Sequence, residues 1–248
     1  ICTLSGEVWM VENPTGATPQ ARWRRFARGL NEPMGLKVVN APIHLTQKCE
    51  LTRLVDTDGN GETDFFENLN DDWGYNGNYH SFATGPVVDG AGNYYVMLTG
   101  HHGVYDVPYL GWCVRLKPQT QDEKSKMKNA VNGSALLSGR FVLDGFCSGL
   151  RMPNGCSAYQ GDVFATDNQG HWIPANKLNH LQAGKFYGHP SSQPAPLKQY
   201  NGDTNFAPPA VWFPYAWVKS ASDITTIIDE RFGPFKGQML VGEFQNAN

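Results

Sequence analysis

The sequence predicts an all-β protein, and specifically a β-propeller. Its apolar segments are short and are bounded almost everywhere by Gly, Pro, Asn or Asp, as strands joined by turns are. A motif of the form GLxxPxG occurs at 29–35 and again at 149–155, and each copy precedes comparable apolar segments. Units of several short strands that repeat at intervals of tens of residues are typical of propeller blades. A β-sandwich would also have short strands, but it would not repeat this motif before equivalent strand pairs.

Composition supports a folded domain and argues against several partners. The 248 residues are 40% hydrophobic and 17% charged, and they include 27 Gly and 16 Pro, so turns are frequent. The formal net charge of −3 argues against a nucleic-acid or anionic-membrane surface. No apolar run reaches the roughly 18 residues that a membrane span needs.

The strands follow one another along the whole chain. We predict strands at 7–11, 36–39, 42–46, 93–100, 111–116, 139–145, 162–167 and 238–244. A weaker copy of the repeat begins at Ala83. Two stretches are compatible with helix: 121–131, a charged surface insertion, and a short turn at 223–229. Because a blade needs about 40–50 residues, residues 1–248 are expected to form one propeller domain of about five blades with partial blades at the ends, part of a longer polypeptide.

The five cysteines are Cys2, Cys49, Cys113, Cys147 and Cys156, and they contain no CxxC motif. Cys147 and Cys156 flank one short loop, so they could pair. Ordinary buried thiols are the alternative.

The segment DTDGNGETDFFE (56–67) matches the calcium-loop pattern D-x-[DN]-x-[DN]-G-x5-E. Calcium prefers six to eight hard oxygens, which alternate residues of a tight loop can supply. The expected ligands are the side chains of Asp56, Asp58, Asn60, Asp64 and Glu67 with the backbone carbonyl of Glu62. Because the flanks are strand-like, we expect a structural ion in an inter-strand turn and no EF-hand; an acidic turn that binds nothing is the alternative.

Polar residues gather where equivalent strands begin or end, the positions that line the mouth of a propeller channel. They include Gln47, Lys48, His80, His101, His102, Arg151 and the segment 167–172. A histidine held by the fold can accept a hydroxyl proton, and a nearby arginine can stabilise the negative charge that develops. Taken singly, such a histidine is more often a surface or hydrogen-bonded residue.

At these residues the sequence resembles the six-bladed glucose/sorbosone dehydrogenase-type propellers, whose soluble members use pyrroloquinoline quinone (PQQ). The likeness is to a largely uncharacterised bacterial branch and covers most of the chain. It is carried by LTRLVDTDGNGETD, GNYHSFATGP, GLRMPNG, DNQGHWIPANKLNHLQAGKFYGHP and FGPFKGQMLVGEF.

The resemblance implies a function in which His80 is the general base and Arg151 lies against the quinone. Such enzymes transfer a hydride from a sugar carbon to PQQ and pass the electrons to a c-type cytochrome or haem domain. The cofactor-binding residues are then expected to be Gln47, Lys48, Arg151, Asn168, Gln169, Gly170 and Trp172. A periplasmic or extracellular location follows. The chain departs from the quinoproteins at Tyr79, where they often have Asp, and at His101 or a neighbour, where a strand-end Asp orients the base.

Two other functions are compatible with the sequence. One is a non-catalytic, calcium-stabilised propeller that binds a glycan or a protein partner. The other is a hydrolase or lyase that acts on carbohydrate through the same channel. The aromatic residues Trp73, Tyr75, Trp172, Tyr187 and Trp212 would stack on sugar rings, although most are expected in the core.

Overall fold

The computed structural model describes residues 1–15, 20–75, 77–100, 107–119, 141–170, 173–192 and 206–245. These residues form five antiparallel sheets. The first contains β1 (Cys2–Thr3), β2 (Glu7–Glu12) and β3 (Arg22–Ala27). The β4–β7 blade contains Gly35–Val38, Ile43–Thr46, Leu51–Val55 and Phe65–Asn70. The β8–β11 blade contains Ala83–Val88, Tyr94–Leu98, Trp112–Pro118 and Phe141–Ser148. The β12–β15 blade contains Pro153–Tyr159, Asp162–Asp167, Asn176–Leu181 and Val211–Phe213. The last sheet pairs β16 (Ala221–Thr226) with β17 (Met239–Glu243).

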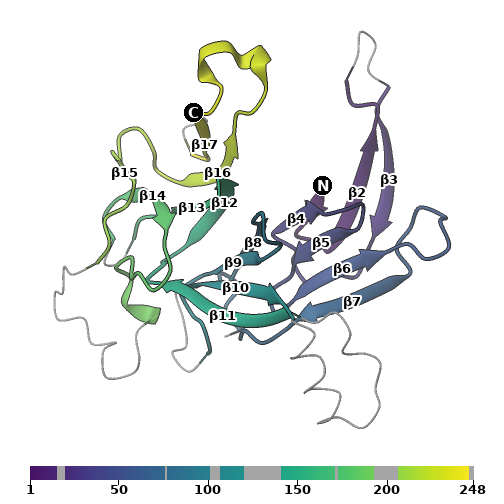
Figure 1. Ribbon diagram of the computed structural model, residues 1–248, viewed down its shortest axis with the longest axis horizontal. Helices are drawn as coiled ribbons and strands as arrows, with labels where there is room; N and C mark the ends of the chain where they lie inside the picture. The colour runs from purple at the N-terminus through teal and green to yellow at the C-terminus, as the bar shows by residue number, and fades with distance from the viewer. Residues whose placement is uncertain are drawn as a thin grey trace.

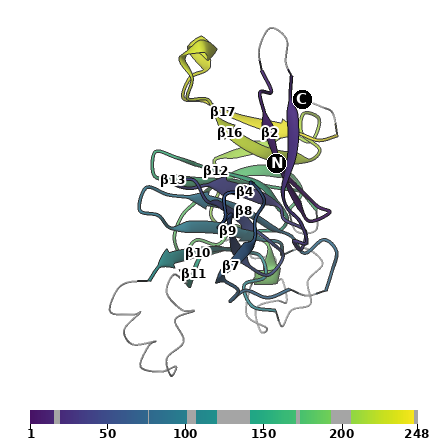
Figure 2. The same cartoon turned by 90° about the vertical axis from the view of Figure 1, so that its right-hand side faces the viewer.

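The sheets follow one another in chain order, and the first strand of each four-stranded sheet lies innermost (Figure 1). In the turned view, β4, β8 and β12 again lie in the middle of the molecule (Figure 2). This is the predicted propeller. The described residues form three complete four-stranded blades, with a three-stranded sheet and a two-stranded sheet at the ends, and the expected count of about five blades stays a prediction.

The hydrophobic core lies between neighbouring blades. In β9, Tyr94, Val96 and Leu98 belong to the apolar cluster shared with the β4–β7 blade. The alternate residues Tyr95 and Met97 belong to the cluster shared with the β12–β15 blade. Because side chains of a strand alternate between its two faces, a strand between two blades buries both faces and is apolar throughout.

The repeated GLxxPxG motif allows the inner strands to approach closely. A Cβ atom added at Gly35, the last residue of the first copy, would lie 2.1 Å from the carbonyl oxygen of Gly85 in β8. A Cβ atom added at the equivalent Gly155 would lie 2.3 Å from the Cα atom of Asp223 in β16. The glycine that ends each copy of the motif therefore allows the inner strands of adjacent blades to pack closely.

The helical elements differ from those predicted. The predicted helical turn at 223–229 is wrong: most of it belongs to strand β16, and a 3-10 helix, η4 (Glu230–Phe235), follows it. Another 3-10 helix, η2, spans Pro190–Ser192. The predicted helix at 121–131 lies outside the described residues.

All five cysteines are free thiols, so Cys147 and Cys156 do not form a disulfide. Cys147 lies opposite Cys113 in the β10–β11 pair.

Candidate functional site

A cavity of about 370 Å³ lies among the inner strands β4, β8, β12 and β16. Thr84, Asn154 and Asp223 line it from three successive sheets. The Thr84 hydroxyl donates to the carbonyl of Pro153 at 3.1 Å, and the Asn154 amide donates to that of Ala221 at 3.2 Å, so these side chains join neighbouring sheets. The cavity is the described part of the propeller channel.

The predicted site residues lie at one edge of the sheets. In a four-stranded antiparallel blade, the turn into the first strand and the loop between the second and third strands share an edge. Backbone hydrogen bonds confirm this: Lys48 N–H donates to the Asn31 carbonyl at 3.2 Å, and Asn168 N–H donates to that of Met152 at 3.1 Å. Gly100 N–H donates to the Arg151 carbonyl at 2.9 Å and so links two blades.

His80 lies in the turn that leads into β8. Its N–H donates to the side chain of Asn78 at 2.8 Å, and its ring centroid lies 3.9 Å from that of Tyr79. Tyr79 is 72% exposed, and its ring covers one side of the imidazole.

Arg151 lies in the equivalent turn before β12. Its backbone N–H and that of Met152 donate to the buried carboxylate of Asp167, at 3.1 Å and 2.7 Å. Its guanidinium donates to the Asn168 carbonyl at 3.3 Å and packs on Gly170, where a Cβ would lie 2.0 Å from the guanidinium carbon. Burial lowers the pKa of Arg151, and Asp167 partly opposes that shift. The arginine is thus a largely desolvated cation at the channel edge.

A buried ion pair supports the Arg151 turn. Lys177 and Asp167 have fully buried side chains, with 3.6 Å between Nζ and Oδ2. The Lys177 ammonium also donates to the carbonyl of Tyr187 at 2.5 Å. Burial lowers the pKa of Lys177, whereas the carboxylate of Asp167 raises it.

The first copy of the repeat has the same arrangement, with the neutral side chain of Gln47 in the place of the Asp167 carboxylate. Asn31 N–H donates to the side-chain carbonyl of Gln47, just as Arg151 N–H donates to Asp167. The Gln47 amide donates to Glu50 and Thr52, both at 2.7 Å. Gln47 is therefore fully engaged within its own blade.

Lys48 is also engaged within the fold. Its ammonium lies 2.9 Å from the carboxylate of Glu32 and donates to the carbonyls of Tyr79 and Ser81. The predicted cofactor ligand Lys48 therefore joins the β4–β7 blade to the turn that carries His80.

The remaining predicted residues divide into two groups. Gln169 N–H donates to Asn176 at 3.1 Å, so the Asn168-Gln169-Gly170 loop is held by a fully buried amide side chain. Asn176 also donates to the carbonyl of Val218 at 2.7 Å, which ties this loop to the segment before β16. Trp172, His101 and His102 lie outside the described residues.

Two aromatic residues at this edge were not among the predicted site residues. Tyr215 and Trp217 lie between β15 and β16, in a segment equivalent to the His80 and Arg151 turns, and they are 55% and 69% exposed. The available signal was their position just before a predicted inner strand, but β16 itself was not predicted.

The sequence matches no known family model and none of the curated proteins. Solved structures do match. A glucose dehydrogenase has a TM-score of 0.62 at 15% identity over 96% of this chain and 74% of its own. A putative oxidoreductase (glucose dehydrogenase) from Thermus thermophilus has a TM-score of 0.62 at 15% identity, covering 98% of this chain and 72% of its own. The apo form of the soluble aldose sugar dehydrogenase from Escherichia coli has a TM-score of 0.56 at 14% identity, covering 98% and 76%.

The fold is that of the sugar dehydrogenase propellers. At such low identity the likeness establishes the architecture, and the chemistry has to be argued from this chain's own residues.

The acidic loop lies between β6 and β7, at the edge opposite the His80 and Arg151 turns. Oxygens of Asp56, Asp58 and Asp64 lie within 4.8 Å of one another and could hold a cation. Asp56 accepts from the N–H groups of Gly59 and Gly61 at 2.7 Å and 2.8 Å, which sets the turn. Hydrogen bonds from Thr57 lower the pKa of Asp64.

The other three expected ligands, Asn60, Glu62 and Glu67, stay predictions. Glu67 lies on β7 opposite Arg53 and forms an ion pair with it, apart from the cluster of three aspartates. The Asn60 side chain is occupied within the loop, where it accepts from Glu62 N–H at 2.8 Å. The backbone carbonyl of Glu62 remains a predicted ligand.

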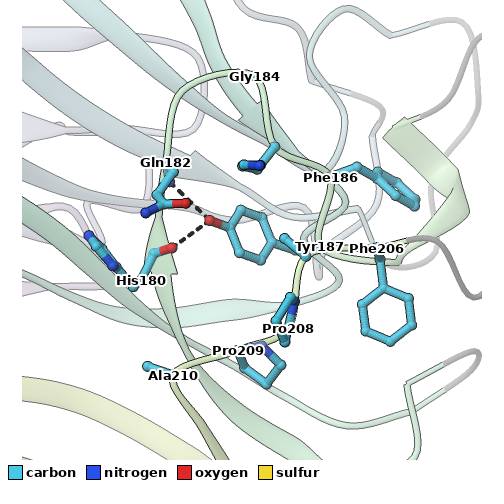
Figure 3. A pocket seen from close by; sticks show the side chains of 11 residues that line it. His180, Gln182, Gly184, Phe186, Tyr187, Phe206, Pro208, Pro209 and Ala210 are labelled. Carbon is cyan, nitrogen blue, oxygen red and sulfur yellow. Dashed lines mark hydrogen bonds between the residues drawn. The ribbon is translucent and has the colours of Figure 1, made fainter.

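A second cavity, of about 530 Å³, lies beside the segment that joins β14 to β15 (Figure 3). The hydroxyl of Tyr187 donates there to the carbonyl of His180 and accepts from Gln182 N–H. Burial raises the pKa of Tyr187 to about 12, and the His180 ring lies 3.0 Å from Asp162. Because the Tyr187 hydroxyl is hydrogen-bonded and weakly acidic, and the His180 ring is paired with Asp162, this larger cavity is a weaker candidate than the channel. Among the described residues, no helix is long and apolar enough to cross a bilayer.

Proposed function

We propose that this chain oxidises a sugar as a quinoprotein-type dehydrogenase, with His80 as its general base. One observation carries the proposal: the turns that hold His80 and Arg151 enter adjacent inner strands at one edge of the channel. The fold shared with glucose and aldose sugar dehydrogenases supports the same substrate class.

The residues at this edge fit PQQ, a planar molecule with several carboxylates. Arg151 offers a buried guanidinium, and Gly170, which has no Cβ, lets that guanidinium pack against the backbone of the loop. The buried side-chain oxygen of Asn168 has no hydrogen-bond partner among the described residues, as expected of a group that awaits a ligand. Arg151, Asn168 and Gly170 would hold PQQ, whereas Gln47 and Lys48 would act from further away.

His80 would accept the hydroxyl proton of the sugar as the adjoining carbon loses its hydride. Arg151 would stabilise negative charge that develops beside it, in surroundings where burial strengthens the interaction. When bound, PQQ supplies a two-electron acceptor. A c-type cytochrome or haem domain is the proposed electron partner, and a periplasmic or extracellular setting is the proposed location, since calcium is abundant there.

A second candidate function is non-catalytic binding of a glycan. The exposed rings of Tyr215 and Trp217 at the channel edge favour it, because aromatic faces stack on the apolar faces of sugars.

Reconstitution with calcium and PQQ tests the proposal, followed by titration with aldoses and an artificial electron acceptor. We expect a shifted quinone absorption band, and a fall in kcat of about 10²–10⁴-fold in His80→Ala. His180→Ala is the matched control, because that histidine lines the other cavity. Failure of PQQ to bind the folded protein would leave glycan binding as the better account.

A further inference from the structure

Lys48 is a buried lysine whose ammonium is fully occupied. Its side chain is 3% exposed, and Nζ lies 2.9 Å from Oε2 of Glu32. The ammonium also donates to the carbonyl oxygens of Tyr79 at 3.3 Å and Ser81 at 3.5 Å. An ammonium has three protons, and here three acceptors surround it. The two carbonyls belong to the residues on either side of His80.

Aromatic rings complete this environment. The ammonium lies 5.0 Å from the ring centroid of Tyr75 and 5.2 Å from that of Phe82, both within the range of cation–π attraction. Phe82 belongs to the same turn as His80, and the two rings are 6.2 Å apart. The lysine thus contacts the turn through its backbone and through a side chain.

The backbone of Lys48 is fixed as well. Its N–H donates to the carbonyl of Asn31 at 3.2 Å, and its carbonyl accepts from Trp73 Nε1 at 2.9 Å. The side chain therefore extends from a rigid point on the β4–β7 blade to the turn before β8.

The propeller fold does not by itself require this bridge. The corresponding residue in the β12–β15 blade is Asn168, which makes the same kind of backbone bond to its own turn. Its side chain is too short to reach the next blade as Lys48 does. The lysine accompanies the one turn that carries the candidate base.

We propose that Lys48 is a positioning residue for His80: it clamps the carbonyls of Tyr79 and Ser81 and so sets where the imidazole stands at the channel edge. The proposal rests on the proposed function and refines it. It also replaces the expected role of Lys48 as a direct cofactor ligand, because its three ammonium protons already have three acceptors within the fold.

Hydrogen exchange of the full chain tests the clamp without any cofactor. The N–H groups of Ser81 and Phe82 donate to the carbonyls of Asn78 and His80 at 2.9 Å and 3.0 Å, so their exchange reports the turn. In Lys48→Met we expect these two amides to exchange at least about tenfold faster, while the amide of Leu45 in β5 is unchanged. Lys37→Met, at an exposed lysine of β4, is the control and should change neither.

Unchanged exchange in the turn of Lys48→Met would overturn the proposal, as would equally faster exchange throughout the blade. If Lys48→Met does not fold, Glu32→Gln weakens the same clamp from a half-exposed side chain. The expected result is then a smaller acceleration confined to the same two amides.

Kinetics and PQQ binding show whether Lys48 positions His80 or binds PQQ directly. We expect Lys48→Met to lower kcat at least about tenfold and to shift the pH profile of kcat, with the sugar KM and the Kd of PQQ within about twofold. Lys48→Arg, which keeps a cation, should recover part of kcat. A raised Kd for PQQ with an unchanged turn would overturn the proposal in favour of direct ligation. If wild-type protein binds no PQQ, the proposed function fails, and hydrogen exchange still decides whether the clamp exists.

Discussion

At the scale of single residues, the candidate site is organised by buried cations that have specific partners. Lys48 is held by Glu32 and by two carbonyls, and Lys177 is held by Asp167 and the carbonyl of Tyr187. A buried charge is tolerated only when a partner compensates the loss of water. Lys48 fixes the turn that carries His80 directly, through the carbonyls of Tyr79 and Ser81. Lys177 acts on the Arg151 turn through Asp167, whose carboxylate accepts from the N–H groups of Arg151 and Met152.

Removing the carboxylate from the second pair should be costly. Asp167→Asn keeps the shape and one acceptor for the N–H groups of Arg151 and Met152, but it leaves the buried cation Lys177 without a carboxylate partner. We expect a loss of about 3–5 kcal/mol in the free energy of unfolding, measured by urea denaturation. Asp162→Asn, on the same strand but exposed and paired with His180, should cost less than about 1 kcal/mol. Equal losses in the two variants would show that burial of the pair is unimportant.

At the scale of strands, close contact between inner strands explains both the repeated glycines and the polar composition of these strands. β12 consists of Pro-Asn-Gly-Cys-Ser-Ala-Tyr, which has no alternating apolar pattern, because Gly155 packs on the backbone of β16. The middle strands of the blades, such as β9 and β10, bury large side chains between blades, whereas the inner strands pack closely through their backbones.

Alanine at Gly35 should therefore disturb the contact between β4 and β8. The added Cβ would lie 2.1 Å from the carbonyl oxygen of Gly85, which cannot move without displacing β8. We expect Gly35→Ala to lower the free energy of unfolding by about 1–3 kcal/mol or more. Gly90→Ala is the control, because its Cβ meets no atom within 4 Å, and it should change stability by less than about 0.5 kcal/mol. Chemical denaturation of both variants measures the difference.

His44 couples the β4–β7 and β8–β11 blades and should make the fold sensitive to acid. Its Nδ1 lies 3.0 Å from the Tyr94 hydroxyl, and burial, followed by the charge of Arg53, lowers the pKa of His44 to about 4. The unfolded chain binds this proton at its ordinary pKa of about 6.5, so the stabilisation is complete above that pH and is lost as the pH falls toward 4. The loss reaches about 3 kcal/mol at most.

The variant His44→Gln keeps a hydrogen-bonding partner for Tyr94 and removes the titrating group. We expect its stability to fall less than that of the wild type between pH 7.5 and pH 4. Parallel curves for the two proteins would exclude His44 as the origin of the acid sensitivity.

At the scale of the whole molecule, the sequence predicts architecture better than it predicts the site. Strands such as β9 were predictable because both faces are apolar, whereas β12 and β16 were not, because glycine and small polar residues form them. The candidate residues could be placed at strand ends from their spacing. The partners of Lys48 could not, since backbone carbonyls of another blade leave no mark in the amino-acid sequence.

The acidic loop should contribute to the stability of the whole molecule, because it joins two sheets. Thr63 N–H donates to the carbonyl of Phe26 in β3 at 2.7 Å, and the Arg24 guanidinium donates to the carbonyl of Gly61. A cation held by Asp56, Asp58 and Asp64 would fix the loop against the first sheet and relieve the repulsion among three close carboxylates.

Calcium should therefore raise the melting temperature of the wild type relative to EDTA, with a stabilisation of about 2.7 kcal/mol when free calcium is 100 times Kd. Asp58→Asn should abolish most of that response, because it removes a carboxylate from the cluster. Glu67→Gln should leave the response intact, since Glu67 pairs with Arg53 and lies outside the cluster. A response lost equally in Glu67→Gln would mean that binding rearranges β7 to complete the shell that the sequence pattern predicts. No response in the wild type would mean that the hydrogen bonds of the loop, and no ion, hold the two sheets together.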